Sequence, residues 1–138
     1  MKVTTKARYG INAVFELVLH ADESPLPLKV IAERQQIPEA YLEQLMMQLR
    51  RAGVVLSARG AFGGYSLAKP ASEITVGEVI RTLEGSMAPV DCLLGDGDGC
   101  RDGRCCPGRI VWERIYDSVN HVMDSLTLEE LAEEYMEQ

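Results

Sequence analysis

No stretch of this 138-residue sequence is apolar for the roughly 18–20 residues that a membrane-spanning helix requires. The N-terminal segment MKVTTKARYG is charged and lacks the apolar run of a secretory signal. Internal repeats are missing as well. We therefore expect a cytoplasmic protein without a membrane partner, in which clustered cysteines indicate metal or redox chemistry rather than structural disulfides.

The residue combinations that most enzymes use are also lacking. The two histidines, His20 and His121, lie far apart in the sequence, and no paired nucleophile and base is recognisable. A glycine loop of the phosphate-binding type is missing too. We expect the protein not to be an enzyme.

Net positive charge, a common mark of nucleic-acid binding, is absent from the chain as a whole, which carries −7. The distribution of charge is uneven, however. Residues 1–70 contain nine Lys/Arg against six Asp/Glu, a balance of +3, whereas residues 71–138 contain five against fifteen, a balance of −10. This asymmetry favours a front half that binds a polyanion and a solvated, acidic back half.

What the sequence does contain is a helical pattern that fits one domain. With 46% hydrophobic residues the chain can bury a single core. The apolar face over residues 5–20 is so wide that we expect this helix to lie inside the domain. Two shorter helices, 28–36 and 38–52, follow with a tight turn between them, which makes a helix-turn-helix candidate. The second of them has an inward stripe of Leu42, Leu45, Met46 and Leu49.

A β-hairpin is expected next. The β-rich runs 54–58 and 65–68 flank the segment ARGAFGG, whose glycines allow the positive φ angles of a hairpin loop. Helix, helix and hairpin is the order of a winged helix-turn-helix. The predicted fold class is therefore mainly α with a small β-hairpin wing, followed by a long dimerisation helix.

The back half begins with a short predicted helix over 76–84 and continues, after the cysteines, with the longest helix over 109–126. Its wide apolar face predicts a dimer interface, because helix-turn-helix modules usually pair to read two half-sites, although ordinary core packing is the alternative. Thr127 and Glu130 form a capping-box pattern that opens a final acidic helix. We divide the chain into a winged helix-turn-helix DNA-binding domain (1–84), a cysteine-rich cluster-binding loop (85–108), and the dimerisation helix with the acidic C-terminal helix (109–138).

Candidate DNA contacts follow from the expected docking of such a domain. The second helix of the motif enters the major groove, and the residues expected to meet base edges are Ala40, Tyr41, Glu43, Gln44 and Met47. Glu43 can accept a hydrogen bond from cytosine, and Gln44 can bond adenine at two atoms. Phosphate contacts, which set the register, are expected from Lys2, Lys6, Arg8, Arg50 and Arg51. The wing contributes Arg59, suited to a narrow minor groove, with the turn glycines Gly60, Gly63 and Gly64.

All four cysteines fall within CLLGDGDGCRDGRCC, residues 92–106, with the spacing C-x7-C-x4-C-C. This is the pattern of neither a zinc ribbon nor a thioredoxin site. Thiolates ligate iron–sulfur clusters, and the glycines between them would let the backbone turn around a bulky inorganic core. The spacing favours a metal or cluster over a thiol-based redox switch, but it does not separate iron–sulfur from zinc.

Several blocks of the sequence together resemble one family. TTKARYGINAVFELVLH, YLEQL, the RGxxGGYxL pattern and ITVGEVI occur in this order, followed by the clustered cysteines. Over nearly its whole length the chain resembles the IscR/NsrR/CymR-type family of bacterial winged helix-turn-helix transcription regulators. The resemblance implies a homodimer whose long helix crosses to the partner subunit. It also implies that Glu43 tunes half-site preference and that Arg59 reads the minor groove.

The same resemblance implies an iron–sulfur cluster, which many members hold through three cysteines before the long helix. By similarity the ligands are Cys92, Cys100 and Cys106, because CPGRIVW matches the segment around the family's last cysteine. Cys105 is an alternative to Cys106 or a fourth ligand. We prefer a [2Fe–2S] cluster to a [4Fe–4S] cluster.

Two departures from the family pattern leave the fourth ligand open. Arg109 stands where one branch has a histidine ligand, and a permanently protonated guanidinium cannot ligate iron. Arg8 stands where the nitric-oxide-sensing branch supplies an acid from the first helix. The candidates that remain are Cys105, a carboxylate, a group of the partner subunit or a small thiol.

The main hypothesis is a homodimeric transcription repressor that binds double-stranded DNA at a palindromic operator. An iron–sulfur cluster that senses iron, redox or nitric-oxide status would set its DNA affinity, because the polar loop gains its ordering energy from cluster binding. One alternative is a cluster-free cysteine-thiol or zinc sensor on the same fold. Another is an iron–sulfur carrier or structural protein without a DNA role.

Overall fold

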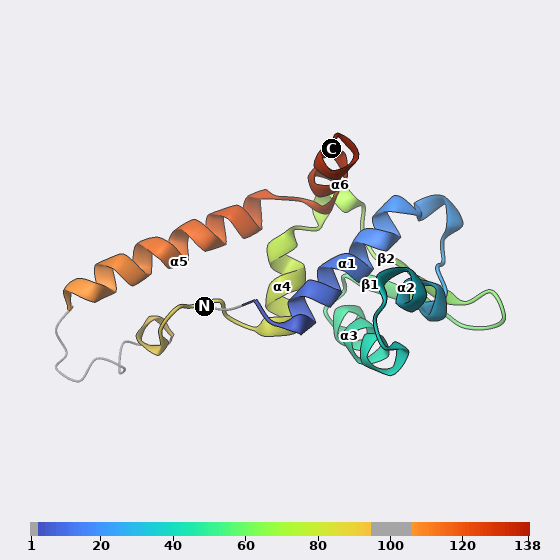
Figure 1. Cartoon of the computed structure of the whole chain (residues 1–138), viewed down its shortest axis with the longest axis horizontal. Helices are drawn as coiled ribbons and strands as arrows, with labels where there is room; N and C mark the ends of the chain where they lie inside the picture. The colour runs from blue at the N-terminus through green and yellow to red at the C-terminus, as the bar shows by residue number, and fades with distance from the viewer. Residues whose placement is uncertain (1–2, 95–105) are drawn as a thin grey trace.

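The computed structural model describes residues 3–94 and 106–138. Figure 1 shows a body of short helices with a β-hairpin on one side and a long helix, α5, that extends away on the other. The elements are α1 (Thr5–Leu19), η1 (Ala21–Glu23), α2 (Leu28–Gln35), α3 (Glu39–Arg51), β1 (Val55–Ala58), β2 (Gly64–Leu67), η2 (Ala71–Glu73), α4 (Val76–Glu84), η3 (Asp91–Leu93), α5 (Pro107–Ser125) and α6 (Leu128–Met136).

Helix α1 is the centre of the body, where it contacts α2, α3, α4, α6 and β2. Ala7, Ala13 and Val14 are fully buried, so the prediction of a helix inside the domain is confirmed. Gly10 lets α1 lie close to α4. A Cβ atom at that position would lie 2.1 Å from the Cδ1 atom of Leu83 on α4.

Helices α2 and α3 form the predicted helix-turn-helix. Gln36 adopts a left-handed conformation (φ 54°) that ends α2, and the buried Ile37 follows in the turn. The predicted stripe of α3 is confirmed, since its four apolar side chains are at most 1% exposed. Pro38 is the N-cap of α3, so the helix begins one residue later than the predicted range 38–52. There its fixed φ and missing N–H cost the helix nothing.

The predicted hairpin is confirmed with slightly shifted ends. Strands β1 and β2 pair antiparallel with Val55 opposite Leu67 and Ala58 opposite Gly64. The backbone of Tyr65 also exchanges hydrogen bonds of 2.9 and 2.8 Å with Leu26, which holds the hairpin against the chain before α2. Gly64 is required at this crossing, because a Cβ atom there would lie 2.2 Å from the carbonyl oxygen of Leu26. The fold class, mainly α with a β-hairpin wing, is that of a winged helix-turn-helix.

The C-terminal helix returns to the core of the body. Thr127 and Glu130 form the predicted capping box at the start of α6, and Leu128 is fully buried. Backbone hydrogen bonds of 2.8 and 2.9 Å join residues 126 and 128 to residues 76 and 74, next to the start of α4. Helix α5 is thus anchored at its C-terminal end, while its N-terminal end extends away from the body (Figure 1). Within the described residues, no helix is both long and apolar enough to cross a membrane.

Candidate nucleic-acid interface and cysteine site

The outward face of α3 exposes four of the five predicted base-reading residues. Ala40, Glu43, Gln44 and Met47 are exposed on the side opposite the buried stripe. Tyr41 is different. It is half-buried, and its ring packs edge-on against that of Tyr9 on α1, with 5.8 Å between the centroids. Four predicted readers therefore share one exposed surface, and Tyr41 joins α3 to α1.

The predicted phosphate-binding cations come from two helices. Lys6 and Arg8 are exposed at the start of α1, and Arg50 and Arg51 are exposed at the end of α3. Arg50 also donates a hydrogen bond of 3.1 Å to the Ser57 hydroxyl, which ties α3 to the first strand of the wing. Lys2 lies outside the described residues.

The wing presents Arg59 and Gly60 to solvent and keeps its last two glycines half-buried. Gly60 has φ +102°, a conformation that favours glycine. A Cβ atom at Gly63 would lie 2.4 Å from the carbonyl oxygen of Ala58, so Gly63, like Gly64, is required by close backbone approach. The four predicted wing residues thus divide into one exposed cation and three glycines that shape the loop.

An open groove of about 440 Å³ joins the wing to the helix-turn-helix. It is lined by cations from three elements: Lys29 on α2, Arg50 on α3 and Arg59 on the wing. The acid Glu39 lines the same groove. The sequence does not point to Lys29, because only the tertiary structure brings α2 to the wing.

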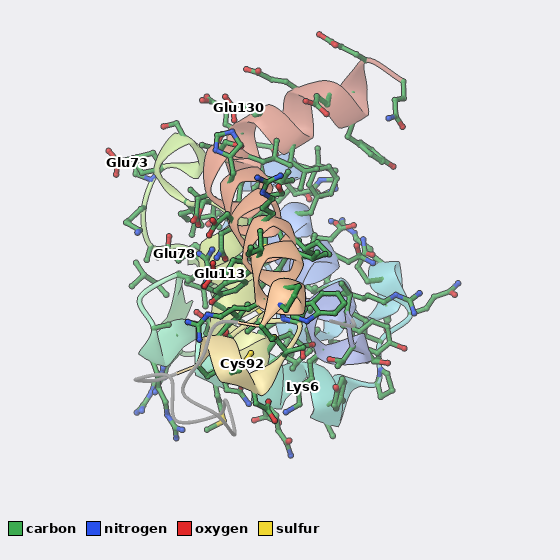
Figure 2. All side chains as sticks on the ribbon, turned by 90° about the vertical axis from the view of Figure 1, so that its left-hand side faces the viewer. Lys6, Glu73, Glu78, Cys92, Glu113 and Glu130 are labelled. Carbon is green, nitrogen blue, oxygen red and sulfur yellow. The ribbon has the colours of Figure 1, made fainter. Side chains whose placement is uncertain are left out.

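The two described cysteines lie on either side of the segment 95–105. Cys92 is half-exposed on η3, which packs against α5, and Cys106 is exposed at the N-cap of α5. Figure 2, which looks along α5 from its free end, shows Cys92 below that helix. Both are free thiols, and the Cys106 side chain makes no capping hydrogen bond. Cys100 and Cys105 lie outside the described residues, and within those residues no three His, Cys, Asp or Glu side chains are grouped as a metal site requires.

Helix α5 leaves most of its apolar side chains either exposed or only half-buried. Among its residues, all of which are described, only Met123 is buried, while Ile110 is 53% and Val122 63% exposed. Val119, Val122 and Met123 line an apolar hollow of about 280 Å³ together with Ser118. The wide apolar face predicted for this helix is therefore largely uncovered within the single chain.

One clamp joins α5 to α4. The Arg81 guanidinium donates hydrogen bonds to both carboxylate oxygens of Asp124, at 2.5 and 3.0 Å, and a third of 2.8 Å to Asn120. The hydrogen bond from Arg81 lowers the pKa of Asp124, with a smaller contribution from nearby His121, and the same bond raises the pKa of Arg81. Gly77 allows this approach, because a Cβ atom there would lie 3.1 Å from the Cβ atom of Met123.

The clamp predicts a pH dependence of stability. Since the folded state lowers the pKa of Asp124, the contribution of this carboxylate is complete above the ordinary aspartate pKa of about 4 and is lost as the pH falls through the folded value. We expect Asp124→Asn to be less stable than the native protein at pH 7 and the difference to shrink as the pH falls below about 4, the ordinary aspartate value. Urea unfolding of the native protein and of Asp124→Asn at a series of pH values measures the difference in the free energy of unfolding. Asp117→Asn, which changes an exposed carboxylate on the same helix, is the matched control, and parallel pH profiles for native protein and Asp124→Asn would contradict the prediction.

Comparisons with known proteins agree with this architecture. The Rrf2 family, described as iron-dependent transcriptional regulators, matches residues 3–134. The regulator CymR of Bacillus subtilis is 45% identical over 132 residues, covering 96% of this chain and 90% of CymR. The regulator IscR of Photorhabdus laumondii is 42% identical over 132 residues, covering 96% of this chain and 79% of IscR.

A solved structure described as that of CymR, the global cysteine regulator of B. subtilis, superposes with a TM-score of 0.80. It is 44% identical, and the match covers 96% of this chain and 97% of that one. The resemblance drawn from the sequence blocks is thereby confirmed. So is the expectation that the protein is not an enzyme, because these relatives are named as transcriptional regulators. The chain belongs to the Rrf2 family of transcriptional regulators.

Proposed function

We propose that this regulator is a cytoplasmic homodimer that represses transcription at a palindromic operator and whose DNA affinity is controlled by an iron–sulfur cluster. The proposed ligands are Cys92, Cys100 and Cys106, with Cys105 as alternative or fourth ligand and [2Fe–2S] preferred to [4Fe–4S]. The cluster would report iron, redox or nitric-oxide status. DNA-binding transcription regulation itself follows from family membership.

The observation that carries the proposal is the position of the described cysteines. Cys92 lies on the element that packs against α5, and Cys106 is the residue from which α5 begins. A ligand held by both would therefore act at the junction of the DNA-binding body with its longest helix. The description of the family as iron-dependent supports iron as part of that ligand.

The donor set fits such a cofactor chemically. Thiol sulfur is the usual protein ligand of iron–sulfur clusters, and Cys92 and Cys106 are free thiols accessible to solvent. When bound, the cluster would supply redox and nitric-oxide reactivity together with ordering energy for the chain between α4 and α5.

Dimerisation is supported by the uncovered apolar face of α5. An exposed stripe with an apolar hollow is a surface that a second copy of the same helix can fill under twofold symmetry. Twofold symmetry in the protein in turn favours a palindromic operator, since each α3 reads one half-site.

Contacts of α4 would connect the cysteine-containing loop 85–108 to the predicted DNA-binding surface. Glu84 is the last residue of α4 and directly precedes the loop 85–108. Its carboxylate accepts hydrogen bonds from the Thr4 hydroxyl and, at 3.2 Å, from the backbone N–H of Ala7. It thereby caps the helix that carries Lys6 and Arg8. The Arg81 clamp, which lies beside Gly77 near the start of α4, joins the same helix to α5. A change of order between α4 and α5 would thus shift both α1 and α5.

Anaerobic purification tests the proposal. We expect a coloured protein with iron and inorganic sulfide in stoichiometric amounts. Its affinity for duplexes selected from a random pool should change on cluster removal and fall steeply with salt, as release of counterions requires. A metal-free protein, or one with zinc alone, would overturn the cluster assignment.

A cysteine-thiol or zinc sensor is the second candidate. It is favoured by one observation, the close similarity to a structure described as a global cysteine regulator. On that account the anaerobic protein is colourless, and thiol oxidation or zinc removal alone changes its DNA affinity.

A further inference from the structure

The wing carries an aromatic side chain that lies almost entirely in solvent. Phe62 is 93% exposed, the largest exposed fraction among the large apolar side chains of the described residues. It lies in the loop between β1 and β2, which projects from the body at the end opposite α5 (Figure 1). Single exposed apolar residues are common on protein surfaces, so exposure alone does not indicate a function for Phe62. Its position in the loop is the informative feature.

The loop geometry holds this side chain at the tip. The Gly63 N–H donates a hydrogen bond of 3.0 Å to the Gly60 carbonyl, which closes a turn with Ala61 and Phe62 at its corners. Close backbone approach at Gly63 and the positive φ of Gly60 constrain the turn on both sides. Corner positions of turns favour small or polar residues, so the turn itself does not require phenylalanine.

The electrostatics around Phe62 favour a polyanion. Residues 52–72 contain no Asp or Glu, whereas Arg59 is exposed in the same loop. The groove at the base of the wing adds Lys29 and Arg50. An apolar tip beside cations is the combination with which several DNA-binding proteins enter the minor groove, where an apolar wedge unstacks a base step and kinks the duplex.

Resting on the proposed DNA-binding function, we propose that Phe62 is a DNA wedge that inserts at a base step of the minor groove while Arg59 occupies the groove beside it. The side chain then contributes specificity without reading a base edge. Pyrimidine–purine steps unstack most readily, so sites with such a step beneath the wing are preferred.

The test uses a duplex enriched by the full-length native protein from a random pool, labelled at its ends for energy transfer. We expect the native protein to bend it. Phe62→Ala should bind about tenfold more weakly and bend the duplex less, because stacking of an aromatic on a base contributes on that order. Phe62→Leu, which keeps an apolar wedge, should retain most of the bend.

Two further measurements separate a wedge from a charge contact or a folding defect. Phe62→Ala should leave the salt dependence of binding and the urea midpoint unchanged, whereas Arg59→Ala should reduce the slope of log affinity against log salt by about one. Equal affinity and equal bending for the native protein and Phe62→Ala would overturn the wedge and leave the regulator intact. If the native protein enriched no duplex, the proposed function would fall, and the wedge with it.

Discussion

Replacing Met46 by alanine is expected to lower the free energy of unfolding by about 3 kcal/mol, within the usual range for truncation of a buried methionine. Met46 is 0% exposed in the α3 stripe, where it packs in the same core cluster as Val14 and Ile31. Because the core is closely packed, the cavity left behind would collapse only in part. Urea unfolding of native protein and variant measures the difference.

The next residue is the matched control. Met47 is the same residue type on the same helix, but it is 38% exposed on the face of the predicted DNA readers. Met47→Ala should change the free energy of unfolding by no more than about 0.5 kcal/mol. Its effect should appear in the affinity for a selected duplex, where a methionine can contact a thymine methyl group. Equal destabilisation by both variants would argue against this orientation of α3.

Replacing Cys106 by serine is expected to remove essentially all iron and sulfide from the anaerobically purified protein, along with its colour. Serine keeps the size of the side chain, but a hydroxyl is a poor ligand for an iron–sulfur cluster. The position makes this replacement informative. Cys106 is the N-cap of α5, and serine is among the best N-cap residues, so the helix should form as well as before.

Cys105→Ser is the matched control for the ligand assignment. If Cys106 is the ligand and another group completes the site, Cys105→Ser retains its iron and colour. A protein that loses its iron only in Cys105→Ser would reverse the assignment. Loss in both variants would identify Cys105 as the fourth ligand. Circular dichroism at 222 nm confirms that either variant remains folded.

The local elements of this protein were predictable from its sequence because their signals are local. Helical spacing identified the buried stripe of α3 residue by residue, and the Thr127–Glu130 pair identified the start of α6. The glycines of ARGAFGG located the hairpin. Such patterns depend on backbone periodicity and on contacts a few residues apart, which the order of residues alone specifies.

The predicted DNA surface was a different case, since spacing does not show how far a side chain is covered by another element. Tyr41, predicted to contact bases, also packs half-buried against Tyr9, thirty-two positions earlier in the chain, and its spacing does not show this contact. Lys29 was overlooked, yet it lines the groove with Arg50 and Arg59. The burial of Tyr41 and the position of Lys29 both depend on how α1, α2, α3 and the hairpin pack together.

By itself the sequence determined the order of elements, the winged helix-turn-helix class and the family, because amphipathic periods, caps and turn glycines act over one or two turns of chain. Only the tertiary structure decided that α6 returns to the body while α5 extends from it. It also paired Arg81 with Asp124, forty-three positions apart, and left Phe62 in solvent at the tip of the wing. These features depend on contacts between distant segments. Burial of the shared core selects those contacts, and no local pattern encodes them.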